Sequence, residues 1–272
     1  SNNFLCLNHD AEISLPKFIK NINFDLIILG PTFLYSRFNP NTFNRFQKEY
    51  HFISKKETYK IAMPQDEYTY SEILDKWMCD WNITSIFTVL PDFKELIYPK
   101  YIKQGKIERG FTMYINSKSL TEFKKKDFKN RNIDISYRAS ALPESYGSIG
   151  QLKSDIALSM SKLLEKFETL NTDISINKNK ILSGKNWYRF LEDSKACLVT
   201  PSGSSIFDPR GEIRIAVERY KLKFPNSKFR EVEVNCFPNE DKKYIMTALS
   251  PRNIEAGLAG TVQICLENYF SE

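Results

Sequence analysis

Short apolar runs and helically spaced apolar residues take turns along the chain, with polar segments between them. The runs 24–29 and 59–63 are six and five residues of mainly apolar side chains that end at Gly or Pro, which predicts buried β-strands. The segment 71–82 instead has apolar residues three and four positions apart, the spacing of one helix face. The first part of the chain therefore predicts strands followed by helices.

The same alternation continues to the C-terminus. Before residue 130 we expect strands at 24–29, 59–63, 85–89 and 111–115, and helices at 42–56, 71–82 and 91–97. After it we expect strands at 133–137, 196–200, 229–233 and 262–266, and helices at 150–170, 186–194, 212–223, 239–248 and 254–260. This order is typical of parallel strands with helical crossovers.

A polar, Lys-rich segment, 116–132, separates the two series and predicts a helix followed by a linker. We therefore expect an α/β protein with two Rossmann-like domains, at 1–130 and 131–272, which face each other across a cleft. Ligands of such sheets bind outside the carboxyl ends of the strands, so polar residues that follow strands are the candidates for chemistry.

Composition excludes several classes of protein. The chain of 272 residues is 42% hydrophobic and 26% charged, values of an ordinary globular protein. No apolar run approaches the roughly 20 residues of a membrane span, and no signal peptide is recognisable at the start. The net charge of +6 is spread thinly, so nucleic acid is not an expected partner. The run Lys124–Lys125–Lys126 predicts a solvated linker, with weak attraction to an anionic membrane surface or a phosphorylated substrate as the alternative.

The number and spacing of the cysteines and histidines predict no metal-binding site. The five cysteines form no C-x-x-C pair, and His9 and His51 are the only histidines. We expect reduced, mostly buried thiols in a cytoplasmic protein that holds no metal. The P-loop, the dinucleotide fingerprint G-x-G-x-x-G, the G-x-S-x-G elbow and a D-x-D pair at a strand end are all absent.

Two carboxylates, Asp66 and Glu67, directly follow the predicted strand 59–63. One of them could act as a general base toward a sugar hydroxyl. The alternative is a structural role, in which Asp66 or Ser71 caps the next helix.

A second cluster follows the strand 133–137. Tyr137 and Arg138 end this strand, a Pro/Gly-rich loop follows, and Lys153 lies near the start of the next helix. Amide groups at a helix start attract phosphate, and the two cations add charge. An ordinary strand–helix loop with an exposed Arg is the alternative.

The third cluster follows the strand 196–200. Ser204 and Ser205 lie in a small, Gly-containing loop that a ligand could approach closely, and Asp208 and Arg210 add a carboxylate and a cation. A Ser/Gly turn with a helix N-cap explains this composition about equally well.

A fourth cluster opens the last predicted helix. Ser250 and Pro251 form a good helix start, and Arg252, followed by Asn253, lies near its positive end, where a diphosphate would bind. Glu255, about one turn further on, could accept hydrogen bonds from ribose hydroxyls. A capping arrangement around Ser250 is the alternative.

These clusters, in this order, carry a resemblance to a known family. The run 250–260 resembles the donor-site helix of GT-B glycosyltransferases, and the chain as a whole resembles glycosyltransferase-like proteins of bacterial surface-polysaccharide clusters, related to the CgeB-type group. The matching pieces are 65–68, 86–89, 137–138, Leu142 and Pro143 with Gly147, Gly184 with Trp187, 202–205 with Asp208 and Gly211, and 250–260 with Gln263 and Ile264. Glu144 and Ser145 depart from the pattern, since relatives tend to have bulkier, aromatic residues there. Chains of this kind commonly continue beyond 263–269 with a loop and a closing helix, so the resemblance implies a small or truncated second domain.

The resemblance implies a GT-B fold with an acceptor-side first domain, a donor-binding second domain and no bound metal. Its donor-binding residues would be Tyr137, Arg138, Lys153, Ser204, Ser205, Ser250, Arg252, Asn253 and Glu255. The candidates for the catalytic carboxylate are Asp66, Glu67 and Asp208.

The expected function is metal-independent transfer of a sugar from a nucleotide-activated donor, with no other cofactor. The acceptor would be a glycan or lipid-linked glycan of a bacterial O-antigen, capsule or lipopolysaccharide. The expected location is the cytoplasm, with weak contact to the inner-membrane surface, and inverting and retaining mechanisms both stay open. One alternative is a non-catalytic protein of this fold that binds nucleotide sugar or glycan. The other, a two-domain nucleotide-sugar epimerase, is disfavoured because it would need a His paired with an acid in the cleft.

Overall fold

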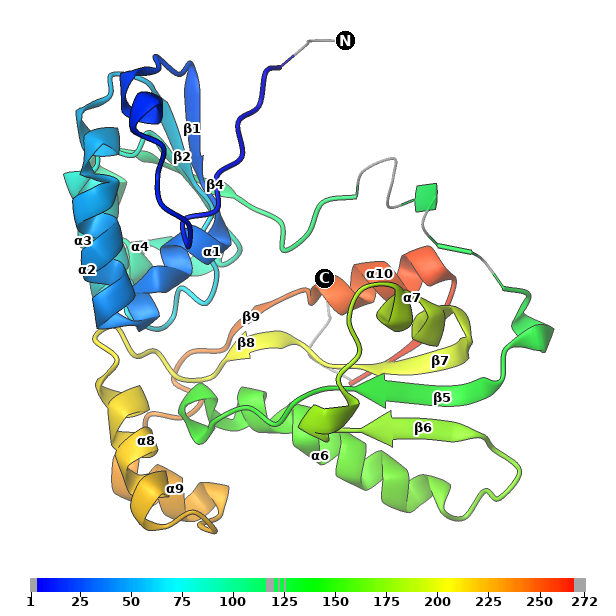
Figure 1. Ribbon diagram of the computed structural model, residues 1–272. Coiled ribbons are helices and arrows are strands. Elements are labelled where there is room, and N and C mark those ends of the chain that lie inside the picture. Colours follow the sequence, from blue (N-terminus) through cyan, green and yellow to red (C-terminus); the bar gives the residue numbers. More distant parts are fainter. Residues whose placement is uncertain (1–3, 116–119, 122, 125, 267–272) are drawn as a thin grey trace. The chain divides into compact units, whose positions relative to one another are not determined.

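The computed structural model describes residues 4–115, 120–121, 123–124 and 126–266, and the chain divides into two compact units, Ser1–Gly110 and Phe111–Glu272 (Figure 1). The boundary predicted at residue 130 lies inside the second unit. One reason is that Phe123 is buried against Leu191 and Tyr188 of that unit. Part of the predicted helix and linker at 116–132 lies outside the described residues.

The first unit is built on a parallel sheet of four strands. These are β1 (Leu26–Leu29), β2 (Tyr59–Ala62), β3 (Ser85–Thr88) and β4 (Lys106–Arg109), in the order β1-β2-β3-β4. The described α-helices are α1 (Pro31–Leu34), α2 (Pro40–Glu49), α3 (Ser71–Asp80) and α4 (Lys94–Ile97). Short 3-10 helices are η1 (Lys17–Asn21), η2 (Tyr35–Phe38), η3 (His51–Lys55), η4 (Pro91–Phe93) and η5 (Tyr101–Lys103).

Every crossover of this sheet runs in the same direction, so right-handed connections bring the helices to one face. That face is buried at Leu29, Ala62 and Ile86. On the opposite face the side chains of Ile28 and Tyr59 are 55% and 45% exposed. The first sheet is therefore covered on one side only among the described residues.

The second unit is built on another parallel sheet, whose strand order reverses. Its strands are β5 (Ile133–Arg138), β6 (Thr172–Ser175), β7 (Ser194–Val199) and β10 (Val262–Cys265), in the order β10-β7-β5-β6. Its helices are α6 (Gly147–Leu164), α7 (Lys185–Glu192), α8 (Glu212–Lys223), α9 (Phe229–Cys236) and α10 (Pro251–Ala259). An antiparallel pair, β8 (Ser202–Ser204) and β9 (Met246–Ala248), and the 3-10 helices η6 (Phe128–Asn130), η7 (Glu144–Tyr146) and η8 (Lys178–Lys180) complete it.

The reversal brings helices to both faces of the second sheet. The connection from β5 to β6 runs one way and the connection from β6 to β7 runs back, so α6 covers one face and α7 and α10 cover the other (Figure 1). The side chain of Leu198 packs toward Ile156 of α6, whereas Val199 packs toward Leu191 of α7 and Ala256 of α10. Both faces of β7 are therefore buried, as is usual in a parallel sheet.

The predicted mixed α/β class with parallel sheets is confirmed, but three predicted elements are wrong. Residues 111–115 form no strand; the last strand of the first sheet is β4, a polar edge strand paired with β3. The segment 229–233 begins helix α9, because Val232 is fully buried while Val234 is 54% exposed, which suits a helix and not an alternating strand. The segment 239–248 is a turn followed by β9, since Asn239 and Lys242 have left-handed backbone conformations that end a helix.

The thiols also differ from the prediction. All five cysteines are free, but only Cys197 is buried, and Cys6 and Cys265 are exposed. Among the described residues no helix has the length and apolar character needed to cross a membrane.

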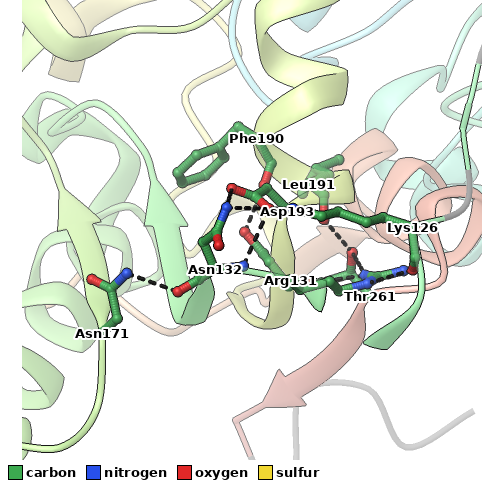
Figure 2. Close-up of polar contacts among 9 residues, drawn as sticks. Lys126, Arg131, Asn132, Asn171, Phe190, Leu191, Asp193 and Thr261 are labelled. Carbon is green, nitrogen blue, oxygen red and sulfur yellow. Dashed lines mark hydrogen bonds and ion pairs between the residues drawn. The ribbon is translucent and has the colours of Figure 1, made fainter. Parts of the chain in front are cut away.

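A buried arginine joins the amino ends of the second sheet. Arg131 is 5% exposed and donates hydrogen bonds to the Thr261 hydroxyl at 3.1 Å (Figure 2) and to the Ser194 carbonyl at 2.7 Å. It also donates to the Ala259 carbonyl at 2.8 Å. Ser194 begins β7, and Ala259 ends α10. One guanidinium therefore links the start of the sheet to the carbonyl end of a helix, where a cation is favoured.

The neighbouring residues extend this cluster. Asp193 accepts two hydrogen bonds from the amide of Asn132, at 3.1 and 2.9 Å, and forms an ion pair with Lys126 (Figure 2). Burial acts to raise the pKa of the Asp193 carboxyl. The hydrogen bonds from Asn132 and the ion pair with Lys126 together outweigh burial and hold this pKa below its usual value. Lys126 is thereby engaged within the protein, and Lys125 lies outside the described residues.

We predict that Arg131→Met lowers the free energy of unfolding by about 2–4 kcal/mol, because buried carbonyls of two elements lose a charged donor. Urea denaturation followed by Trp187 fluorescence measures this loss in the second unit. Lys129→Met, at an exposed neighbouring position, serves as the control and should change stability by less than about 0.5 kcal/mol. Equal stability of the two variants would contradict a structural role for Arg131.

Candidate functional site

The strand order of the second sheet defines the place where a ligand is expected. Because the connection from β5 to β6 and the connection from β6 back to β7 run in opposite directions, a crevice forms outside the carboxyl ends of β5 and β7. A small cavity of about 10 Å³ lies there, close to the minimum that holds one water molecule. Its lining comes from the ends of both strands, from α7 and from the start of α10: Ser136, Tyr137, Arg138, Trp187, Phe190, Leu191, Cys197, Leu198, Val199 and Arg252.

Three of the predicted donor-binding residues line this cavity. Arg138 donates to the Asp173 carboxylate at 2.6 Å, and its guanidinium lies 4.5 Å from the centre of the Phe190 ring. Its side chain is 11% exposed, and its Nε is buried without a hydrogen-bond partner among the described residues. Arg138 also donates to the backbone carbonyls of Tyr137 and Asp173, so three of its five donors are used within the protein.

Arg252 is the more available cation. Its guanidinium lies 5.8 Å from the centre of the Trp187 ring, and it forms no ion pair with a described residue. The Nε1 of Trp187 donates to the Glu255 carboxylate at 2.8 Å. Glu255 thus fixes the indole on which Arg252 rests, instead of presenting a free carboxylate.

Tyr137 brings an unsatisfied hydroxyl to the same place. Its side chain is 4% exposed, and its hydroxyl has no hydrogen-bond partner in the part of the chain that the structure describes. Burial raises the pKa of this phenol, and the nearby Thr200 side chain and the charge of Arg252 act in the opposite direction. The Thr200 hydroxyl is nevertheless not placed to form a hydrogen bond with the Tyr137 hydroxyl. At neutral pH Tyr137 is therefore a neutral hydroxyl that can still donate a hydrogen bond.

The start of α10 lacks a side-chain cap. Ser250 occupies the N-cap position in an extended conformation, yet its side chain makes no capping hydrogen bond. Asn253 is buried and its amide donates to Gln263 on β10 at 3.0 Å, so it ties the helix to the sheet. The positive end of α10 therefore has Arg252 beside it and no carboxylate cap.

The start of α6 is already occupied by an acid of the chain itself. The Asp241 carboxylate accepts from the backbone N–H of Ser148 at 3.0 Å and from the Ser205 hydroxyl at 2.5 Å, and the Ser205 hydroxyl accepts from the N–H of Ile149 at 3.2 Å. Gly147 has φ +67°, and a Cβ there would lie 2.3 Å from the Ser205 hydroxyl. This helix start is filled, so the predicted phosphate site between 138 and 153 has its positive end neutralised.

The remaining predicted donor residues lie around this filled start. Ser204 and Ser205 are fully buried, and the Ser204 hydroxyl donates to the carbonyl of Ile206 at 2.9 Å. Lys153 lies on α6 and is partly buried. Neither serine presents a hydroxyl to solvent.

Asp208 is also engaged within the fold. It is 4% exposed, and its carboxylate accepts from the backbone N–H groups of Ile213 at 3.3 Å and Arg214 at 2.9 Å. It therefore caps the first turn of α8. Burial raises the pKa of this carboxyl, and the backbone hydrogen bonds oppose that effect.

Glu67 lies in a closed polar cluster of the first unit. Its carboxyl is fully buried and accepts from the Tyr98 hydroxyl at 2.5 Å and the Thr88 hydroxyl at 2.9 Å. Burial raises its pKa to about 7, although these hydrogen bonds and the charge of Arg37 act in the opposite direction. Glu67 therefore contacts protein groups and not solvent.

Asp66 is the predicted carboxylate that solvent reaches. Its backbone has φ +52°, its side chain is partly exposed, and one carboxylate oxygen accepts from the Tyr68 hydroxyl at 2.7 Å. Arg37, which is 2% exposed, donates to the carbonyls of Gln65 at 2.7 Å and Asp66 at 2.8 Å. The buried guanidinium thus fixes the loop that presents Asp66.

Sequence reasoning missed three residues that shape these sites. Trp187 belongs to a matching segment of the family resemblance but was not among the predicted binding residues, although an aromatic in the first turn of a helix is a usable signal. Arg37 and Asp241 act through contacts with residues about 30 and 36 or more positions away. No local pattern marks such contacts. Within the described residues, no group of three or more His, Cys, Asp or Glu side chains could hold a metal ion.

Comparisons of the chain with protein-family models, curated proteins and solved structures gave no match.

We predict that Glu67 makes the first unit less stable as the pH rises. The folded pKa of about 7 lies above the unfolded value of 4.5, so the protonated carboxyl stabilises the fold and this stabilisation is lost as the pH rises from about 4.5 through 7. Wild type should lose on the order of 1–3 kcal/mol relative to Glu67→Gln over this range. Urea denaturation at pH 5 and pH 8, followed by fluorescence of Trp77 and Trp81, measures the difference.

Glu72→Gln, at an exposed position in the first turn of α3, is the matched control and should keep the pH dependence of wild type. Parallel pH profiles for wild type and Glu67→Gln would show that the Glu67 carboxyl titrates at its ordinary pKa.

Proposed function

We propose that the second unit binds the diphosphate of a nucleotide sugar at the carboxyl ends of β5 and β7, and that the chain is a metal-independent glycosyltransferase of the GT-B type. The observation that carries this proposal is the convergence at one cavity of Arg252, the unsatisfied Tyr137 hydroxyl and the uncapped start of α10. All three groups donate hydrogen bonds or carry positive charge, and among the described residues Arg252 has no ion pair, the Tyr137 hydroxyl no hydrogen-bond partner and the start of α10 no side-chain cap. A phosphate is the ligand such a set favours.

The ring of Trp187 supports a nucleotide in preference to a simple anion. It lies beside Arg252 and is held by Glu255, so a rigid aromatic surface adjoins the proposed phosphate site. Aromatic rings stack with nucleobases. In the transfer step, Arg252 and the helix start would stabilise the negative charge that develops on the departing nucleotide.

The acceptor would be a glycan or lipid-linked glycan of a bacterial cell surface, and Asp66 is the carboxylate best able to accept a proton from its hydroxyl. Asp66 is partly exposed and its loop is fixed by Arg37, whereas Glu67 and Asp208 are buried in structural contacts. A buried carboxylate can act on a sugar only after a rearrangement of its surroundings.

A non-catalytic protein that binds nucleotide sugar or glycan is the second candidate. The burial of two of the three predicted carboxylates favours it. It shares the same donor site, so binding alone does not separate the two functions.

We predict that calorimetric titration with UDP, GDP, CMP and the corresponding sugar nucleotides detects binding of at least one of them. Arg252→Ala should weaken it about 10- to 100-fold, because a charged hydrogen bond to phosphate is lost. Arg189→Ala, at an exposed position of α7 outside the cavity lining, is the matched control and should bind like wild type. Binding of none of these nucleotides, or equal affinity of the Arg252 variant, would rule out the proposed donor site.

The same preparations separate the two functions. If the chain is an enzyme, Asp66→Asn should keep the affinity for the nucleotide and lower transfer or hydrolysis of the donor sugar by at least about 100-fold. Wild type that binds the donor without turning it over in the presence of a glycan acceptor would favour the binding protein.

A further inference from the structure

The turn between α8 and α9 exposes two large apolar side chains. Helices α8 and α9 lie side by side in the second unit and pack through Val217, Val232 and Phe237 (Figure 1). At their connection every residue from 222 to 226 is exposed, and the side chains of Leu222 and Phe224 are 85% and 53% exposed. Two such residues within three positions of a projecting turn make an unusually apolar tip.

Three exposed cations lie in the sequence around this tip. Arg219, Lys223 and Lys228 are exposed, and none of them forms an ion pair with a described residue. From 219 to 228 the sequence has no Asp or Glu. The tip therefore has an exposed positive charge next to exposed apolar surface.

The nearby acids already have partners. Glu218 pairs with Arg214 at 2.9 Å, and Glu233 pairs with Arg230 at 2.7 Å. The Glu231 carboxylate accepts from the backbone N–H of Lys228 at 2.7 Å and caps the start of α9. Lys221 is excluded from the exposed set because it pairs with Glu144 at 2.9 Å. The exposed positive charge of the turn therefore comes from Arg219, Lys223 and Lys228.

We propose that this turn docks onto an anionic phospholipid surface. Leu222 and Phe224 would enter the boundary between headgroups and acyl chains, while Arg219, Lys223 and Lys228 would contact lipid phosphates. Burial of apolar side chains and attraction to anionic lipid are the two contributions that hold peripheral proteins on membranes, and both are present here.

The observations favour a membrane over an acidic protein or a nucleic acid. Nucleic-acid sites use planar groups that stack on bases or donate hydrogen bonds to them. Leu222, the more exposed of the two apolar residues, can do neither. An acidic protein partner would need a shaped apolar pocket for the tip, while a bilayer accepts any projecting apolar side chain. This inference does not depend on the proposed glycosyltransferase activity, because none of its residues lines the nucleotide site.

The direct test is flotation of the full chain with two kinds of vesicle. One kind is neutral phosphatidylcholine, and the other contains about 30–40% phosphatidylglycerol, which gives its surface a negative potential. We expect binding to the anionic vesicles, weakened by high salt, and little binding to the neutral ones. Leu222→Ser with Phe224→Ser should reduce the partition coefficient by about tenfold. Each of Arg219→Gln, Lys223→Gln and Lys228→Gln should reduce it about fivefold.

A matched control exists in the same unit. Ile181 is 58% exposed beside Lys178 and Lys180 of η8, so Ile181→Ser and Lys178→Gln remove the same kinds of group elsewhere. Their partition should equal that of wild type. The proposal would be overturned by equal binding to neutral and anionic vesicles, by unchanged binding of the tip variants, or by equal losses in the control variants. The apolar and charge variants test it independently. Circular dichroism verifies that each variant is folded.

Discussion

The backbone pairing of β5 is the constraint on which the second unit depends. This strand hydrogen-bonds to β6 on one side and β7 on the other, so the chain runs one way from β5 to β6 and back past β5 from β6 to β7. The helices then cover both faces, and a crevice opens at the carboxyl ends of β5 and β7. In the first unit the order β1-β2-β3-β4 never reverses among the described strands, so it offers no such crevice.

The two ends of the second sheet are used differently. At the amino ends Arg131 and its neighbours satisfy one another and fix the strands. At the carboxyl ends two helix starts could attract an anion, and they differ: Asp241 fills the start of α6, whereas the start of α10 has Arg252 and no carboxylate. This difference in local charge is the reason for proposing the start of α10, and not that of α6, as the phosphate site.

The sequence predicted the parts of the fold that local apolar pattern determines. Strands β1, β2, β3, β5 and β7, with their buried apolar residues, were found close to where they lie, and α8 has the predicted bounds. Strands β4 and β6 were missed because their sequences, Lys-Ile-Glu-Arg and Thr-Asp-Ile-Ser, are polar and suit the edges of sheets. Arg252 could be predicted from its place at a helix start, but the burial of Asp208 and Glu67 could not, because it depends on contacts distant in sequence.

The central claim is that a nucleoside diphosphate binds where β5, β7 and α10 meet. The most direct measurement is the electron density of crystals soaked with the nucleotide that binds in solution. We expect phosphate density at the start of α10, within hydrogen-bond distance of Arg252 and the Tyr137 hydroxyl, with the base near Trp187. Density at the start of α6 with Asp241 displaced, or at the amino ends of the strands, would contradict it.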